Sequence, residues 1–164
     1  MSTSTALLHH SCFLVYDLEK SAQKLADALS TTFHFWTIEP QTCTVRGKAS
    51  PFSFRIALAD MGDATIELLT PRTGYSVYYD HLREKGEGFH HCCLVYPTLA
   101  EMQKAKESYE ARGFEMIQHA ETPETFEFCY FDLTEAKLIM ELLYLSGLPD
   151  PEQSLTPNSA AQPA

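Results

Sequence analysis

The spacing of apolar residues at the start of the chain predicts a strand, then a helix and then further strands. An apolar run rich in strand formers at 7–16 predicts a strand, and Asp17 just after it can cap a helix. That helix would carry apolar residues at helical spacing, namely Leu18, Ala22, Leu25, Ala26 and Leu29. Strand-like runs follow at 33–38, 52–59 and 65–69, separated by turn signals. The first 71 residues therefore read as a β-α-β-β-β unit.

The same order returns later in the chain. A strand is predicted at 89–96, Thr98 can cap a helix that runs through Arg112, and Gly113 follows as a favoured helix terminator. Three more strands are predicted at 114–118, 125–131 and 137–145. We expect an α+β fold of two tandem βαβββ modules at 6–71 and 88–145.

Two segments lie outside these modules. Residues 72–87 read as a linker, but one rich in aromatic side chains (Tyr75, Tyr78, Tyr79 and His81), so we expect it to cover part of a cleft or a dimer surface. Residues 146–164 are rich in Pro, Ser, Ala and Gln with few large apolar residues. This composition predicts a disordered tail.

Composition restricts the partners and the compartment. The chain has 164 residues, 45% of them apolar, and 12 basic against 22 acidic residues give a net charge of −10. Such a charge disfavours nucleic acid and anionic membranes. No apolar run reaches the ~18 residues of a membrane span, and the polar start at 1–5 lacks a basic region leading into an apolar core. The five cysteines include no Cys-x-x-Cys spacing, so we expect reduced cysteines and a cytoplasmic protein.

The two modules also repeat a set of chemically active residues. His9-His10-Ser11-Cys12 is echoed by His90-His91-Cys92-Cys93, and Glu67-Leu68-Leu69 is echoed by Glu141-Leu142-Leu143. Because alternate residues of a strand share a face, one histidine of each pair should face inward. Each glutamate shares its face with apolar residues, and a buried carboxylate needs a compensating cation. The alternative is that the glutamates face solvent on edge strands and the histidines are packing residues.

If both strand pairs face one cleft, two imidazoles and two carboxylates meet at a metal site. Without thiolates, such a set suits Fe(II), Co, Ni, Mn or Zn and leaves one or two positions for water or substrate. An open site of this kind indicates catalysis rather than scaffolding.

With these motifs, the stretch at 7–145 resembles the vicinal oxygen chelate superfamily, which includes glyoxalase I, methylmalonyl-CoA epimerase, extradiol dioxygenases and bleomycin-resistance proteins. Gly88-Phe89-His90-His91 and the two Glu-Leu-Leu strand ends look most like the epimerase branch. The resemblance implies a cupped mixed sheet around one divalent metal. It also implies that the ligands are the second histidine of each pair, His10 and His91, together with Glu67 and Glu141.

These features lead us to expect a metal-dependent isomerase or epimerase that abstracts a proton next to a carbonyl of a small molecule, with acyl-CoA as one candidate. Glu141 is the first candidate for the base and Glu67 the second, although either could be a ligand alone. Tyr130 and Arg55 are secondary candidates for orienting the substrate. The alternatives are a lyase, a glyoxalase-like enzyme, an extradiol dioxygenase or a metal-free small-molecule-binding protein. We also expect a homodimer, since an open sheet leaves edges and an apolar face that need cover.

Overall fold

The two strands that carry the histidine pairs lie side by side at the middle of the fold. In the computed structural model, which describes residues 6–158, β1 (Leu7–Leu14) runs antiparallel to β7 (Gly88–Val95). Each has a parallel neighbour on its other side, β6 (Thr65–Thr73) next to β1 and β10 (Leu138–Leu145) next to β7. The two halves of the sheet are therefore built alike.

The other strands extend this centre in both directions. The order across the sheet is β11-β2-β5-β6-β1-β7-β10-β9-β8-β3-β4. The remaining bounds are β2 (Phe33–Ile38), β3 (Thr42–Val45), β4 (Lys48–Ala49), β5 (Ser53–Asp60), β8 (Glu115–Thr122), β9 (Phe126–Leu133) and β11 (Gln153–Leu155). The result is a large, curved and unclosed mixed sheet with few helices, which confirms the expected α+β class.

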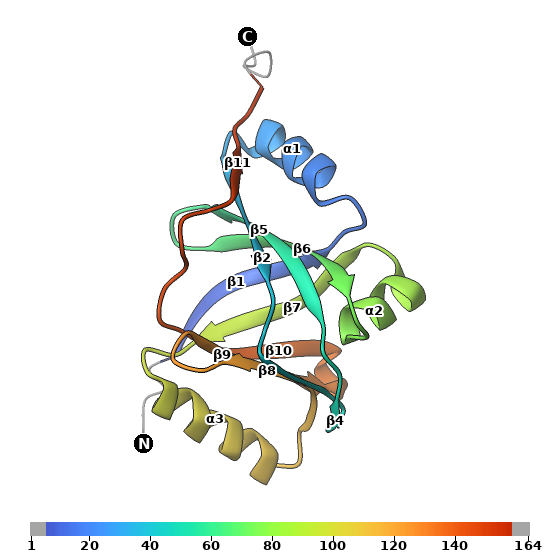
Figure 1. The fold of residues 1–164 in the computed structure, drawn as a ribbon, viewed down its shortest axis with the longest axis vertical. Helices are drawn as coiled ribbons and strands as arrows, with labels where there is room; N and C mark the ends of the chain where they lie inside the picture. Colours follow the sequence, from blue (N-terminus) through green and yellow to red (C-terminus); the bar gives the residue numbers. More distant parts are fainter. Residues whose placement is uncertain (1–5, 159–164) are drawn as a thin grey trace.

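Two helices occupy equivalent places in the two halves. Figure 1 shows α1 (Leu18–Leu29) and α3 (Leu99–Ala111) toward opposite ends of the long axis, with β1 and β7 between them. Both caps form as predicted, since the Asp17 carboxylate accepts the Lys20 N–H and the Thr98 hydroxyl accepts the Glu101 N–H. Each helix packs its apolar face on the outer side of its own half of the sheet. The inner side is left to form the site.

A third helix lies in the segment that the sequence presents as a linker. Helix α2 (Val77–Lys85) follows β6, and the short 3-10 helix η1 (Thr134–Ala136) precedes β10. Tyr78 of α2 is fully buried, and its hydroxyl lies 2.8 Å from the hydroxyl of Tyr130 on β9. The aromatic residues of 72–87 thus contribute to the interior of the cup, although Tyr75 and Tyr79 remain exposed.

The chain between α1 and β5 connects the two outer regions of the sheet. Strand β2 pairs with β5 in the first half, whereas β3, only a few residues later, pairs with β8 in the second half. Residues 33–45 therefore pass from one side of the cup to the other. This crossing closes part of the interior and places Trp36 and Ile38 against the cavity described below.

The expectation of disorder from residue 146 onward is wrong for residues 146–158. Strand β11 pairs antiparallel with β2, the Trp36 indole N–H donates to the Pro149 carbonyl at 2.9 Å, and the Glu152 carboxylate accepts from the N–H and hydroxyl of Thr37. The physical reason is that the edge of β2 offers unpaired backbone groups, which a polar segment can satisfy without much apolar area of its own. Residues 159–164 lie outside the described part of the chain.

Removal of residues 146–164 should therefore destabilise the protein. We expect the free energy of unfolding to fall by about 2–4 kcal/mol, from lost hydrogen bonds and from exposure of the Trp36 ring. Urea unfolding of a chain that ends at Leu145 measures this effect, and a chain that ends at Asn158 is the matched control. Equal stability of the two shortened chains would show that β11 adds nothing.

The described residues contain neither a membrane-spanning helix nor a disulfide. Within residues 6–158, no helix is long and apolar enough to cross a membrane. All five cysteines lie in this range and all are free, as the sequence predicts.

Candidate metal centre

The strand register relates the two histidine strands by an approximate local twofold symmetry. Across the β1–β7 pair, His10 lies opposite Cys93, and Cys12 lies opposite His91. The parallel neighbours repeat the relation, because Glu67 lies beside Cys12 and Glu141 lies beside Cys93. The sequence repeat therefore delivers equivalent residues from both halves to one place.

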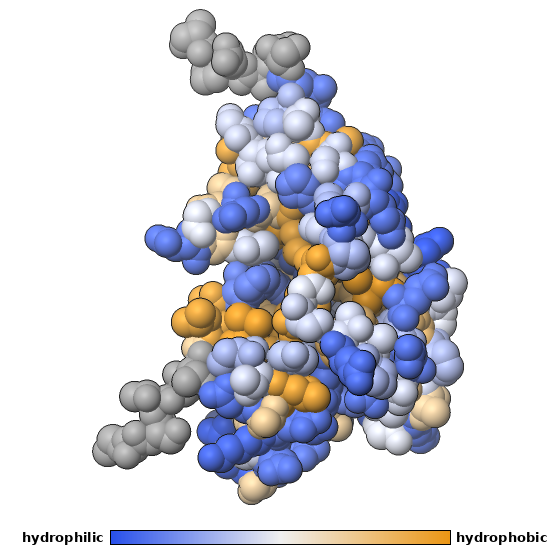
Figure 2. All heavy atoms as spheres, turned by 60° about the vertical axis from the view of Figure 1, so that its left-hand side comes forward, coloured by the Kyte–Doolittle hydropathy of each residue, from blue (hydrophilic) through white to orange (hydrophobic). Residues whose placement is uncertain are grey.

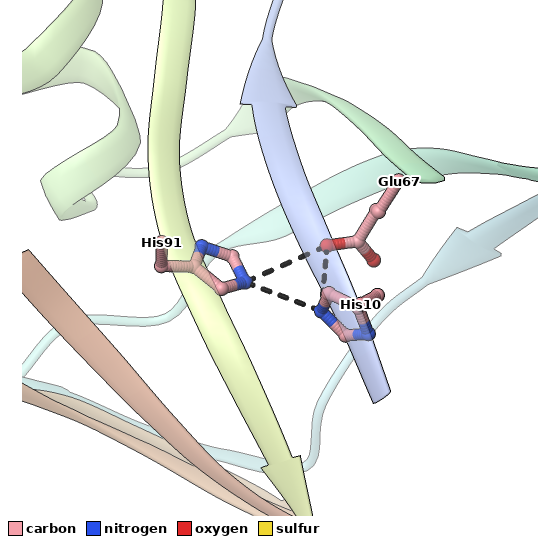
Figure 3. Close-up of side chains that lie close together, drawn as sticks. All are labelled: His10, Glu67 and His91. Atoms are coloured by element: carbon pink, nitrogen blue, oxygen red, sulfur yellow. Dashed lines mark hydrogen bonds and ion pairs between the residues drawn. The ribbon is translucent and has the colours of Figure 1, made fainter. Parts of the chain in front are cut away.

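All four predicted ligand side chains converge there. His10 Nε2 lies 3.2 Å from Glu67 Oε2, 3.0 Å from Glu141 Oε2 and 3.3 Å from His91 Nε2. His91 Nε2 lies 3.1 Å from Glu141 Oε2 and 3.6 Å from Glu67 Oε2. Figure 3 shows His10, Glu67 and His91 pointing at one another from neighbouring strands. All four side chains are buried.

These five spacings between a histidine nitrogen and another donor atom match those of ligands around a single ion. Donor atoms at about 2.0–2.2 Å from one metal lie about 2.8–3.6 Å from one another in tetrahedral or octahedral geometry. Two imidazole nitrogens and two carboxylate oxygens also form a donor set that Zn, Co, Ni, Mn and Fe(II) accept. The residues present therefore fit a divalent metal.

The neighbouring histidines keep both buried carboxylates ionised. Burial raises the pKa of Glu141, but the neighbouring His91 and His10 lower it by more, and the net pKa lies well below the usual range. The pKa of Glu67 is likewise lowered, with burial opposed mainly by His10. Burial disfavours a charged His10, yet the carboxylate of Glu67 raises its pKa well above the usual value. Two buried carboxylates thus stay ionised, and a divalent ion would balance both.

The structure corrects the expectation that His9 points away from His10. The β1–β7 register shifts twice, once at His9 and once near His90. Each shift leaves the first histidine outside the regular ladder, so that it lies beside its neighbour instead of on the opposite face. The Nδ1 atoms are 2.9 Å apart in the His9–His10 pair and 2.8 Å apart in the His90–His91 pair.

This contact gives the outer histidines a role in holding the inner ones. An inner histidine that offers Nε2 to a metal carries its proton on Nδ1, and that N–H can donate to Nδ1 of a neutral neighbour. Burial, followed by the charge of the adjacent inner histidine, lowers the pKa of both His9 and His90, which keeps them neutral. The same arrangement occurs at both pairs.

Other nearby residues divide into those that reach the site and those that do not. Cys93 Sγ lies close to His10 and Glu141, but burial raises the pKa of its thiol well above the usual value, so it stays protonated. Tyr130 packs its ring 4.7 Å from that of His91. Arg55 does not reach the site, since its guanidinium pairs with Glu19 of α1 on the outer side of the sheet. Of the two secondary candidates for orienting a substrate, Arg55 is therefore excluded and has a structural role.

A cavity of about 300 Å³ opens onto the four-residue cluster. His10, Glu67 and Glu141 line it, whereas His91 lies behind them and is fully buried. A small molecule in the cavity would therefore meet three of the four side chains directly. This arrangement suits an open catalytic site better than a closed structural one.

A second group of metal-ligand residue types lies on β8 and β9. His119, Glu121 and Glu127 come close to one another there. Glu127, however, already accepts hydrogen bonds from Gln103 and from Lys106, which fastens α3 to the sheet. The Lys106 ammonium neutralises the Glu127 carboxylate, so we assign a structural role to these three residues.

Comparison with known proteins supports one family. The model of the Glyoxalase/Bleomycin resistance protein/Dioxygenase superfamily matches residues 9–130, which include three of the four clustered side chains. No curated protein matches the chain by sequence.

Several solved structures share the fold. Methylmalonyl-CoA epimerase from Mycobacterium tuberculosis is 18% identical with a TM-score of 0.62, over 90% of this chain and 93% of that one. The hypothetical protein BH1468 from Bacillus halodurans C-125 is 17% identical with a TM-score of 0.60, and the match covers 89% of this chain and 99% of that protein's chain. A Streptomyces coelicolor methylmalonyl-CoA epimerase variant in complex with 2-nitronate-propionyl-CoA is 15% identical with a TM-score of 0.58. The match covers 86% of this chain and 98% of the epimerase chain. At these identities the likeness concerns the fold.

Proposed function

Because the chain belongs to the glyoxalase/bleomycin resistance protein/dioxygenase superfamily, we propose that it is a metal-dependent isomerase or epimerase of a small carbonyl compound. In this proposal His10, Glu67, His91 and Glu141 bind one divalent ion. The ion is Co, Ni, Mn, Zn or Fe. The observation that carries the proposal is the convergence of four buried donor atoms at the floor of a cavity.

The chemistry would take place where the cavity meets the cluster. A divalent ion supplies Lewis-acid stabilisation of the negative charge that develops when a carbon next to a carbonyl loses its proton. Glu141 takes that proton in our proposal, with Glu67 as the alternative, since both carboxylates face the cavity. For an epimerase, a second group must then deliver a proton to the opposite face of the same carbon, while the base keeps the proton that it removed until solvent exchange.

The surrounding residues favour this reaction by excluding water. Tyr130 is 2% exposed, and its hydroxyl is held by Tyr78, so it forms a fixed wall beside His91. Apolar side chains form most of the remaining wall. A carboxylate base in such surroundings keeps its position between turnovers.

Several structural neighbours are methylmalonyl-CoA epimerases, and one of them is in a complex with methylmalonyl-CoA and NH4+. An acyl-CoA is therefore one candidate substrate class for this chain. A 2-hydroxy ketone is another, because it too has an acidic hydrogen beside a carbonyl.

Deuterium incorporation tests the proposed reaction. The metal-loaded protein is incubated in heavy water with 2-methyl thioesters or 2-hydroxy ketones, and exchange at the carbon next to the carbonyl is followed by mass spectrometry. We expect exchange that EDTA stops and that added metal restores. If no carbonyl compound exchanges while the Fe(II)-loaded protein consumes oxygen with a catechol, the protein is a dioxygenase instead.

Replacement of the outer histidines should weaken the metal site without removing it. His9→Ala and His90→Ala each remove the partner of an inner Nδ1–H, and loss of such a partner typically lowers metal affinity about 10–100-fold. Competition with a chelator of known affinity measures the change. Unchanged affinity in both variants would show that these contacts do not support the ligands.

We also propose a cytoplasmic homodimer. Support for a dimer comes from large apolar side chains that are exposed on the two central strands, namely Leu7, Leu8 and Phe89. The free cysteines support a reducing compartment. Light scattering at micromolar concentration should give twice the monomer mass, and a monomer mass would contradict the dimer.

A further inference from the structure

The walls of the cavity are mostly apolar and come from both halves of the sheet. Strands β2 and β5 supply one group, Trp36, Ile38, Phe54, Ile56 and Leu58, and strands β9 and β10 supply the other, Phe126, Phe128, Leu143 and Leu145. Leu148 from the C-terminal segment adds to the second. Figure 2 shows hydrophobic side chains gathered in a hollow of the surface, between hydrophilic residues.

The polar atoms of the aromatic lining are already engaged. The Trp36 indole N–H donates to Pro149, and the Tyr130 hydroxyl is paired with that of Tyr78. Nδ1 of His34 lies 2.7 Å from the Ser154 hydroxyl. These residues therefore present carbon surface to the cavity, while oxygen-binding groups are concentrated at its floor around His10, Glu67 and Glu141.

No Lys or Arg is among the described residues that line the cavity, so any cationic group is confined to the floor around His10, whereas Asp60 adds a carboxylate to those of Glu67 and Glu141. The alternation of β5 turns Phe54 and Ile56 inward and Arg55 outward, where Arg55 pairs with Glu19. A ligand carboxylate held against the apolar wall, away from the floor, would lose its hydration without a cationic side chain to replace it.

We propose that this cavity selects a largely apolar or aromatic carbonyl compound and rejects one that carries a carboxylate at the end away from the carbonyl. The carbonyl part of this inference rests on the proposed function, and the charge selection rests on the wall. The cavity volume of about 300 Å³ lies at the low end for small-molecule sites. It suits a compound with one ring and a short side chain.

Trp36 makes the inference directly measurable, because it is the one tryptophan of the chain and lines the cavity. The probes are propiophenone and 4-carboxypropiophenone, which share ring and carbonyl and differ by the charged group. Titration of the metal-loaded protein, followed by Trp36 emission and corrected with N-acetyltryptophanamide, gives both dissociation constants. We expect saturable binding of propiophenone and about 100-fold weaker binding of the carboxylate, the penalty of an unpaired buried charge.

A charge variant tests the cause of the selection. Leu148→Arg places a cation at a cavity residue that is 37% exposed, and it should reduce the discrimination to tenfold or less. Leu29→Arg is the matched control, because Leu29 is 38% exposed at the end of α1 and does not line the cavity. Equal or tighter binding of the carboxylate by the unmodified protein, or no saturable binding of either probe, would overturn the inference. Selective binding of propiophenone without deuterium exchange would keep it and contradict the proposed reaction.

Discussion

Replacing His91 by Ala should abolish stoichiometric metal binding and reduce turnover to background. His91 is fully buried, and its Nε2 lies within 3.1–3.6 Å of Glu141 and Glu67. Without it, the remaining residues would leave a buried metal with an incomplete set of ligands. We expect metal affinity to fall by more than about 100-fold, beyond the range seen when only a supporting residue is lost. Elemental analysis of protein purified without chelator measures the occupancy.

The same outcome is expected for Ala at His10, Glu67 and Glu141, since the twofold register makes His10 equivalent to His91 and Glu67 equivalent to Glu141. The double variant of His119 and Glu127 serves as the control, because these residues form the other His/carboxylate group and should not affect the metal content. Full occupancy in the Glu141→Ala and His91→Ala variants would contradict the assignment.

Replacing Glu141 by Gln should separate catalysis from metal binding. Glutamine keeps the shape of the side chain and a carbonyl oxygen that can still reach a metal, but it cannot accept a proton as a base. We expect the Glu141→Gln protein to retain metal and to lose deuterium exchange about 10²–10⁴-fold, the usual contribution of a positioned base.

Glu67→Gln is the matched control for this experiment, because Glu67 occupies the equivalent place in the other half of the sheet. We expect it to retain metal and most of the exchange. The opposite pattern, with exchange lost only in Glu67→Gln, would assign the base to Glu67. Exchange preserved in both variants would exclude either glutamate as the base.

Much of the fold was predictable because it depends on short-range patterns. The β2 strand at 33–38, the Asp17 and Thr98 caps and the two repeated units follow from alternation, helical spacing and capping chemistry. The convergence of the four candidate ligands was also predictable, since a duplicated unit tends to place equivalent residues around one axis. Strand alternation from Phe54 to Ile56 could even have shown that Arg55 faces outward.

The features that the sequence did not predict depend on the register of a partner strand or on contacts that form only in the folded protein. His9 lies beside His10 because the β1–β7 register shifts there, and a single strand carries no sign of its partner's register. Helix α2 is short and mostly polar on its surface, and its anchor Tyr78 is buried only because the cup already exists. Strand β11 forms because the edge of β2 is free to pair with it, and the amino-acid composition of residues 146–158 does not show that this edge exists.

Anomalous diffraction from a crystal of the Co- or Zn-loaded protein, collected at the metal's absorption edge, tests directly whether the four residues bind one ion. We expect one strong peak per chain, coordinated by His10, Glu67, His91 and Glu141 and adjoining the apolar cavity. A peak at His119 and Glu127 instead, or no peak while the four side chains contact only one another, would contradict this assignment.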